Sequence, residues 1–158
     1  MKKQNIKKLI SSIFICQLAG IIGLVFTSSS VNDWYTAIQK PYFNPPSWVF
    51  APVWTLLFLM MGVSLYLVLI KRWDRNIKTG VILFGFQLGL NIIWSFLFFG
   101  LKNPFFAFIE IIILWAAILL TIFKFWKIDR KASYLLIPYF LWVTFAAILN
   151  FNIYILNL

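Results

Sequence analysis

The third long apolar stretch of the sequence carries a row of side chains that could bind a flat ligand. Gln87, Asn91, Trp94 and Phe98 are spaced three or four residues apart, so on an α-helix they fall within about 60° of one another at about 100° per residue. Indole and phenyl rings stack on flat apolar molecules, and side-chain amides hydrogen-bond to polar groups at their edges. We therefore expect this face to line a ligand-binding cavity.

The fifth apolar stretch carries a matching face. Its members are Pro138, Trp142, Ala146, Leu149 and Ile153, with Asn150 at the edge. At about 1.5 Å per residue, Trp54 and Trp94 lie about 5–8 Å from the outer ends of their helices and Trp142 lies about 21 Å from its own. These depths predict one cavity that opens outward and has Trp142 as its floor. Such a cavity suits a large flat hydrophobic ligand with few polar groups.

A competing interpretation of the same residues needs no ligand. Tryptophans near the ends of membrane helices commonly anchor the chain at the interface, and amides such as Asn91 and Asn150 can hydrogen-bond between helices. Anchoring fits Trp34 and Trp48, but it does not fit Trp142, which lies deep in its stretch.

Composition excludes several other chemistries. The 158 residues include no His and one Cys, Cys16. This excludes His-based acid–base catalysis, His-ligated metals, a haem held by a proximal His and an intrachain disulfide. No nucleophile–base pair supports hydrolysis, and we expect neither a metal nor an obligatory cofactor.

The chain also has the composition of a membrane protein. It is 63% hydrophobic and 11% charged, whereas soluble domains are roughly half apolar and a quarter charged. Its 18 Phe and eight Trp are more than so short a soluble chain could bury. The net charge of +10 lies in short clusters between apolar runs, which indicates topology signals rather than a nucleic-acid-binding surface.

Five apolar stretches are long enough to span a bilayer. We expect one domain over 1–158, an all-α integral membrane protein with five transmembrane helices in a single bundle, at 9–26, 51–70, 79–99, 105–125 and 134–156. A signal peptide is the alternative interpretation of the basic start, but the first run is long and lacks a clean small-residue cleavage site. Ser133 is the expected N-cap of the fifth helix.

The basic residues are distributed unequally between the two sides of this topology. Twelve of the 14 Lys and Arg fall on the side of the N-terminus and of the loops after the second and fourth spans, and Lys40 and Lys102 fall on the other. This asymmetry predicts a cytoplasmic-membrane protein with its N-terminus inside and its C-terminus outside. The loop at 34–46 then faces outward.

The opposite face of the third helix carries small residues. Gly85 and Gly89 form a GxxxG pair, with Ile92 and Phe96 beside them, and small residues four apart let two helix backbones approach closely in lipid. We expect a homodimer through this face. The alternative is that the glycines pack against another helix of the same chain.

The loop between the first two spans is stiffened by prolines. Pro41, Pro45, Pro46 and Pro52 fix φ and remove backbone donors. A short helix around 32–39 is expected to stop at Lys40, because a residue before proline disfavours the helical region.

Three blocks of residues, taken together, resemble a known family. They are Trp34-Tyr35, Lys40-Pro41, Pro45-Pro46, Trp48 and Pro52-Val53-Trp54; then Gln87-Leu88, Asn91, Trp94 and Phe98-Phe99-Gly100; then Pro138-Tyr139, Trp142, Phe145-Ala146 and Leu149-Asn150. In order and spacing they are similar to the TspO/MBR family of tryptophan-rich sensory proteins and translocator proteins. The resemblance covers nearly the whole chain.

The resemblance implies a ligand as well as a dimer built on the third helix. Family members bind porphyrins and other tetrapyrroles, which implies a membrane sensor or regulator that holds such a ligand by ring stacking. The expected ligand-binding residues are Trp34, Lys40, Pro45, Pro46, Trp54, Gln87, Asn91, Trp94, Phe98, Trp142, Ala146, Leu149 and Asn150. Two alternatives stay open: a transporter of porphyrin or lipid, and a catalyst of light-dependent porphyrin degradation in which Trp54 and Trp142 supply electrons.

Two charged residues have open roles. Glu110 is the one acidic residue within a span, and it could act in ligand access or be a protonated carboxyl bonded to a neighbouring helix. Lys40 could be a solvated loop charge or the partner of a ligand carboxylate. No basic residue follows Phe151 and Tyr154, so the cholesterol-recognition pattern of animal family members is incomplete, and strong cholesterol binding is not expected.

Overall fold

The computed structural model describes residues 3–158, and helices are the only regular elements in that range. The long helices are α1 (Lys3–Ser28), α3 (Ser47–Leu69), α4 (Arg75–Ser95), α5 (Pro104–Trp126) and α6 (Arg130–Leu156). A short helix, α2 (Trp34–Ala37), precedes α3, and a π-helix, η1 (Phe96–Gly100), continues α4. All five long segments are apolar enough to cross a membrane. The expected all-α membrane fold is therefore confirmed.

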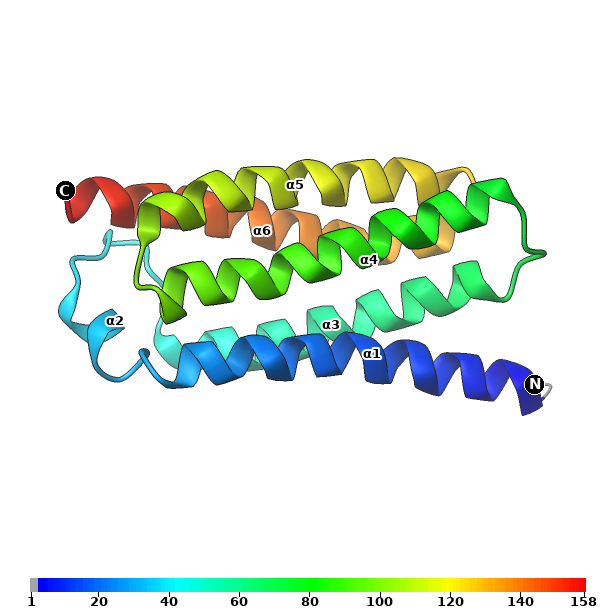
Figure 1. The fold of residues 1–158 in the computed structure, drawn as a ribbon, viewed down its shortest axis with the longest axis horizontal. Coiled ribbons are helices and arrows are strands. Elements are labelled where there is room, and N and C mark those ends of the chain that lie inside the picture. Colours follow the sequence, from blue (N-terminus) through cyan, green and yellow to red (C-terminus); the bar gives the residue numbers. More distant parts are fainter. Residues whose placement is uncertain (1–2) are drawn as a thin grey trace.

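The five long helices form one bundle (Figure 1). Helix α1 packs beside α3 and α4, α6 packs beside α3 and α5, and α4 packs beside α5, so the order around the bundle is α1, α3, α6, α5, α4. The described N-terminal end lies at one end of the bundle, and α2, its flanking loops and the C-terminus lie at the other. We call residues 29–46, which cover this second end, the lid. Lys2, one of the basic residues used to predict topology, lies outside the described residues.

Helices α4, α5 and α6 begin one to four residues before the predicted apolar runs, and a polar side chain caps each of these starts. Asp74 accepts a hydrogen bond from the backbone N–H of Ile77, and Asn103 accepts one from Phe106. The predicted cap of the fifth helix, Ser133, is wrong. Asp129 caps α6 four residues earlier by accepting from Lys131 and Ala132, while the Ser133 hydroxyl donates to the carbonyl of Ile122 at 3.0 Å.

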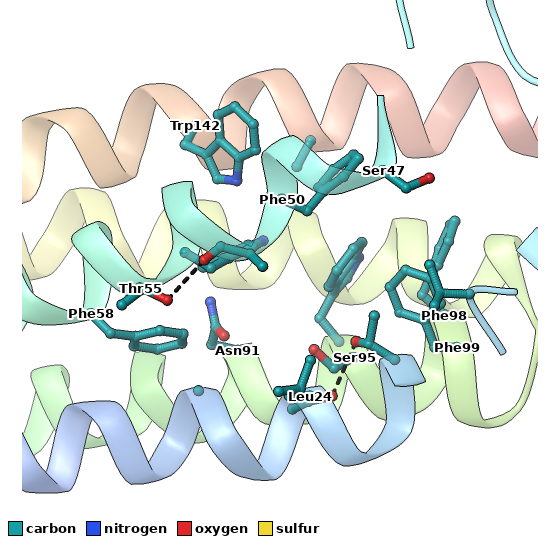
Figure 2. Close-up of a pocket in the computed structure, with 18 of the residues that line it drawn as sticks. Leu24, Ser47, Phe50, Thr55, Phe58, Asn91, Ser95, Phe98, Phe99 and Trp142 are labelled. Atoms are coloured by element: carbon teal, nitrogen blue, oxygen red, sulfur yellow. Dashed lines mark hydrogen bonds between the residues drawn. The ribbon is translucent and has the colours of Figure 1, made fainter. Parts of the chain in front are cut away.

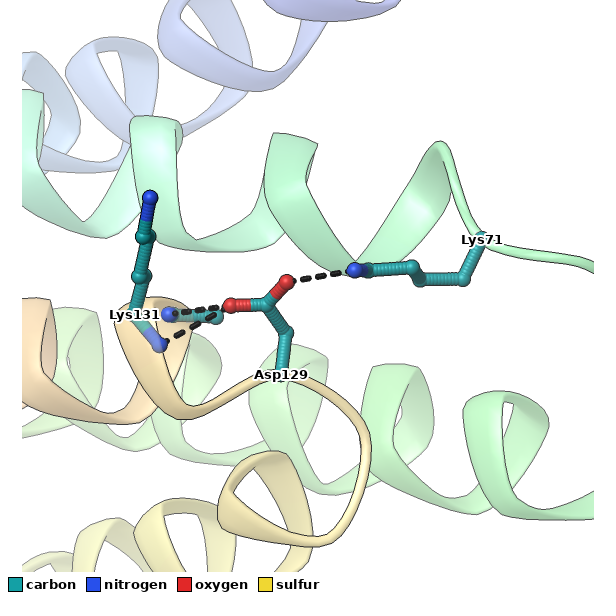
Figure 3. A network of polar contacts seen from close by, with 4 residues as sticks. Lys71, Asp129 and Lys131 are labelled. Atoms are coloured by element: carbon teal, nitrogen blue, oxygen red, sulfur yellow. Dashed lines mark hydrogen bonds and ion pairs between the residues drawn. The ribbon is translucent and has the colours of Figure 1, made fainter.

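Asp129 also ties two loops together at the end opposite the lid (Figure 3). Its Oδ2 atom lies 2.6 Å from Nζ of Lys71, which follows α3. Partial burial on its own raises the pKa of Asp129, but the hydrogen bonds from Lys71, Ala132 and Lys131 and the charge of Lys71 outweigh it, so the pKa lies below its ordinary value. The carboxylate is therefore charged at neutral pH and fixes the start of α6 against the end of α3.

The π-helix η1 changes the direction of the side chains at the lid end of α4. The N–H of Leu101 bonds to the carbonyl of Phe96 at 2.8 Å, a spacing of five residues instead of four. The wider turn brings both Phe98 and Phe99 toward the bundle interior, although an unbroken α-helix would separate them by about 100°. Lys102 then reverses the chain with φ of 52°.

Candidate functional site

The bundle contains a cavity in its lid half (Figure 2). Its volume is about 300 Å³, near the lower end of the range of small-molecule sites. Residues of α1, α3, α4, η1, α6 and the lid line it, and among the described residues none of the lining comes from α5. The opposite half is filled by side chains such as Phe84 and Phe125, whose rings stack 5.8 Å apart.

Aromatic rings make most of the cavity wall, and their neighbours fix them. Trp94 stacks on Phe98 with ring centroids 5.2 Å apart and an interplanar angle of 18°. Trp54 stacks on Phe58 at 5.6 Å, and Trp142 meets the edge of a Phe50 ring at 6.0 Å. Because these rings already pack against partners, they form a preformed apolar surface that suits a flat molecule.

Most polar groups around the cavity are already satisfied by the protein. The Trp94 indole N–H donates to Asn150 Oδ1 at 3.1 Å, and the Asn150 amide donates to the Pro104 carbonyl at 2.8 Å. The Asn91 amide donates to the Tyr139 hydroxyl at 3.1 Å. These amides therefore hold helices together, as the competing interpretation proposed for Asn91 and Asn150, while their residues still line the cavity.

The indole N–H of Trp142 is different. Its Nε1 atom is buried and has no hydrogen-bond partner among residues 3–158. Trp142 lines the cavity, and Figure 2 shows its nitrogen directed away from α6 and toward the interior between the helices. A buried donor without an acceptor costs about 1–3 kcal/mol, so this group is the natural hydrogen-bonding position for a bound molecule.

Two further polar residues lie deeper than the cavity wall. Gln87 is 1% exposed and does not line the cavity; its Oε1 accepts from the Tyr139 hydroxyl at 2.8 Å. Glu110 on α5 is buried, and neither of its carboxyl oxygens has a hydrogen-bond partner within residues 3–158. Of the two roles left open for Glu110, the carboxyl bonded to a neighbouring helix is therefore not found among the described residues.

The lid places the predicted loop residues behind the cavity wall. Trp34 contacts Phe98 edge-on at 5.5 Å, and Lys40 donates to the backbone carbonyls of Tyr35, Thr36 and Ile38. Lys40 thus caps the short helix α2. Neither residue lines the cavity, and the same holds for Pro45 and Pro46.

Two lid residues, Val31 and Tyr35, line the cavity, and Tyr35 is the polar one. Its hydroxyl donates to Asn44 Oδ1 at 2.7 Å. Burial raises the pKa of Tyr35 to about 12, although the bond to Asn44 opposes this rise, so the phenol stays protonated and keeps donating.

The structure thus brings eight of the thirteen predicted ligand residues to one cavity. These are Trp54, Asn91, Trp94, Phe98, Trp142, Ala146, Leu149 and Asn150. Helix α1 also lines the cavity, which its sequence did not predict; its lining residues include Gln17, Gly20, Ile21, Leu24 and Thr27. Helix α1 carries no aromatic–amide face that would have marked it, and its small Gly20 was the available signal.

The predicted dimer face also has a clear place. A Cβ atom added to Gly85 or Gly89 would meet nothing within 4 Å, so the alternative that these glycines pack against another helix of the same chain is wrong. Ile92 packs against the core and Phe96 contacts Phe26 of α1 at 5.3 Å. The free surface beside the glycines is completed by the exposed side chains Ile82, Phe86 and Ile93.

Comparison with known proteins gives consistent matches. A sequence model of the TspO/MBR family matches residues 12–156. The chain is 45% identical over 158 residues to Tryptophan-rich protein TspO of Chlorobaculum tepidum, covering 99% of both chains. It is 33% identical over 138 residues to Translocator protein of Ovis aries (85% of this chain, 81% of the relative). It is 32% identical over 126 residues to Tryptophan-rich sensory protein of Cereibacter sphaeroides (80% and 78%).

Proposed function

The chain belongs to the TspO/MBR family, and from this premise we propose that it binds a tetrapyrrole, or another flat hydrophobic molecule, inside the membrane and acts as a sensor or regulator. Relatives named sensory protein and translocator protein support a membrane sensor, regulator or transporter in general. The finer assignment to a tetrapyrrole rests on the chemistry of the cavity.

The observation that carries this proposal is the indole N–H of Trp142, a buried donor on the aromatic wall that has no hydrogen-bond partner among residues 3–158. A ligand that stacks between the rings of Trp54, Trp94 and Trp142 and presents an acceptor to Nε1 of Trp142 would satisfy this buried indole donor, which has no partner among residues 3–158. A porphyrin combines a wide aromatic plane with carboxylate and nitrogen acceptors. Lys40 is not needed for this binding mode, because its ammonium already caps α2.

Titration of protoporphyrin IX into the protein in lipid nanodiscs tests the proposal. We expect saturable binding, and we expect it to weaken in Trp54→Ala, which removes a cavity ring. Trp73→Phe is the matched control, because Trp73 is exposed in the loop at the opposite end of the bundle and should bind as the wild type does. Equal affinities for Trp54→Ala and the wild type would contradict binding in this cavity.

Two further measurements separate the functional classes. Flux of protoporphyrin into sealed proteoliposomes would identify a transporter, and light-dependent product formation from bound protoporphyrin would identify a catalyst. Binding with neither result supports the sensor or regulator.

We propose that the molecule acts as a homodimer through α4, with its lid on the outer side of a cytoplasmic membrane. The open space at Gly85 and Gly89 supports close approach of a second α4. The basic side chains concentrated at the end opposite the lid support an N-terminus inside and a C-terminus outside.

A further inference from the structure

The cavity has an opening, and its position follows from the exposure of the lining residues. Ile21 and Leu24 of α1 are 58% and 56% exposed. Ser47, Ala51 and Thr55, spaced four residues apart on α3, are exposed as well. All lining residues from α4, η1, α6 and the lid are buried or half-buried. The cavity therefore opens sideways, between α1 and α3.

The lid end of the cavity is closed by several bonds. The Ser30 hydroxyl donates to the carbonyl of Phe99 at 2.8 Å. Gln39 and Asn157 exchange two hydrogen bonds of 3.0 and 2.9 Å, which tie the lid to the C-terminal end of α6. Tyr35 packs on Phe99 beneath them. A ligand arriving from water at this end would have to break these contacts.

The seam between α1 and α3 is tight farther from the lid. A Cβ atom on Gly62 would lie 2.6 Å from the Cα atom of Ile13, so the two backbones touch there. Nearer the cavity, the Gln17 amide donates to the Thr55 carbonyl at 3.1 Å. The seam is thus closed up to Gln17 and Thr55 and open from there toward the lid.

The opening lies at the depth of the hydrocarbon. Thr55 is eight residues into α3 and Ile21 is seven residues from the end of α1, which places them about 12 and 10 Å below the helix ends at about 1.5 Å per residue. The Thr55 hydroxyl donates to the carbonyl of Ala51 at 2.8 Å, so this part of the rim offers lipid no unpaired hydroxyl donor. A rim of this kind admits apolar molecules without a desolvation cost.

We propose that this opening, bounded by Ile21 and Leu24 on α1 and by Ala51 and Thr55 on α3, is a lateral portal through which the cavity takes its ligand from the lipid. The ligand class is a flat apolar molecule that has first dissolved in the half of the bilayer on the lid side. The portal extends the proposed function by giving its route, and it makes binding depend on ligand concentration in the membrane rather than in water.

A photoreactive apolar probe tests the portal without relying on porphyrin binding. Adamantyl diazirine dissolved in nanodisc lipid should label α4 at Trp94 and Ser95, inside the cavity, as read by mass spectrometry. Ala51→Trp should reduce this labelling to background, and Ile21→Trp, on the other rim, should do the same. Leu59→Trp is the matched control, because Leu59 is exposed on α3 but does not line the cavity.

A locked lid gives the opposite arm of the test. Gln39→Cys and Asn157→Cys, joined as a disulfide in a Cys16→Ser background, should leave labelling of Trp94 and Ser95 unchanged. Interior labelling that survives both Trp variants, or that disappears when the lid is locked, would overturn the portal.

Protoporphyrin IX kinetics connect the portal to the proposed function. Ala51→Trp should slow association by at least about tenfold, and the wild-type rate should follow the amount of protoporphyrin per lipid rather than its concentration in water. A rate that follows the aqueous concentration would overturn the portal. If protoporphyrin does not bind at all while the diazirine result holds, the tetrapyrrole assignment fails and the portal stands.

Discussion

The Cβ atom that Gly62 lacks would lie 2.6 Å from the Cα atom of Ile13, so α3 and α1 are in backbone contact at this point. Gly62→Ala must push the two helices apart, and we expect it to lower stability in detergent by about 1–3 kcal/mol, as other overpacked sites do. Gly85→Ala is the matched control, since its added methyl meets open space and alanine is the better helix former. Thermal unfolding of both variants measures the difference. Equal losses would show that the contact is not the cause.

The ion pair between Asp129 and Lys71 predicts a dependence of stability on pH. Because the folded pKa of Asp129 lies below its ordinary value, its stabilising effect is complete above the unfolded pKa of about 3.9 and is lost as pH falls through the folded pKa. The background is small, since the chain has only four acidic residues. We expect Asp129→Asn, which can still cap α6, to remove this acid-sensitive component.

Asp129→Ala separates the cap from the ion pair. It should lose about a further 1 kcal/mol at neutral pH relative to Asp129→Asn, because the N-cap acceptor is gone. The measurement is unfolding in detergent between neutral and acidic pH. An unchanged acid profile in Asp129→Asn would contradict the assignment.

The open face of α4 predicts the effect of bulky side chains on assembly. Replacing both Gly85 and Gly89 by Leu should prevent the close approach of two α4 helices and give monomers in size-exclusion chromatography with light scattering. Protoporphyrin binding should largely persist, because neither glycine lines the cavity. A double variant that stays dimeric would place the interface elsewhere.

Single cysteines test the orientation of the bundle. Ser29 at the lid end and Asn76 at the opposite end are both exposed. In a Cys16→Ser background, Ser29→Cys should react with a membrane-impermeant maleimide in intact cells, and Asn76→Cys should react only after lysis. The reverse pattern would invert the proposed topology.

The sequence was sufficient to predict the five helices and much of the cavity wall because both follow from helical spacing. Gln87 shows where spacing fails. It shares a face with Asn91, yet a hydrogen bond from the hydroxyl of Tyr139 holds it behind the cavity wall. This contact joins two helices, so it cannot be predicted from the residue spacing along either one. Phe99 was not predicted as a cavity residue, because the prediction assumed a uniform angle of about 100° per residue. The π-helix η1 changes that angle at the end of α4.

The route into the cavity could not be predicted for a related reason. The depth of Trp142 and Asn91 suggested an opening toward the lid, but the path is set by contacts between distant segments. Gln39 bonds to Asn157 across 118 positions, and Gln17 bonds to Thr55 across 38. Neither pairing leaves a periodic pattern in either segment.

The indole N–H of Trp142 is a buried donor at the cavity wall that lacks a partner in the described part of the chain. Trp142→Phe keeps an aromatic ring but removes the N–H, so protoporphyrin affinity should fall by the value of one hydrogen bond, about 0.5–1.5 kcal/mol. Trp142→Ala should lose about as much again, because stacking is also removed. Trp73→Phe serves as control. If Trp142→Phe also abolishes light-dependent porphyrin loss while most binding remains, the indole takes part in the chemistry and the catalyst is favoured over the sensor. Equal affinities for the wild type, Trp142→Phe and Trp142→Ala would show that the ligand does not reach this nitrogen.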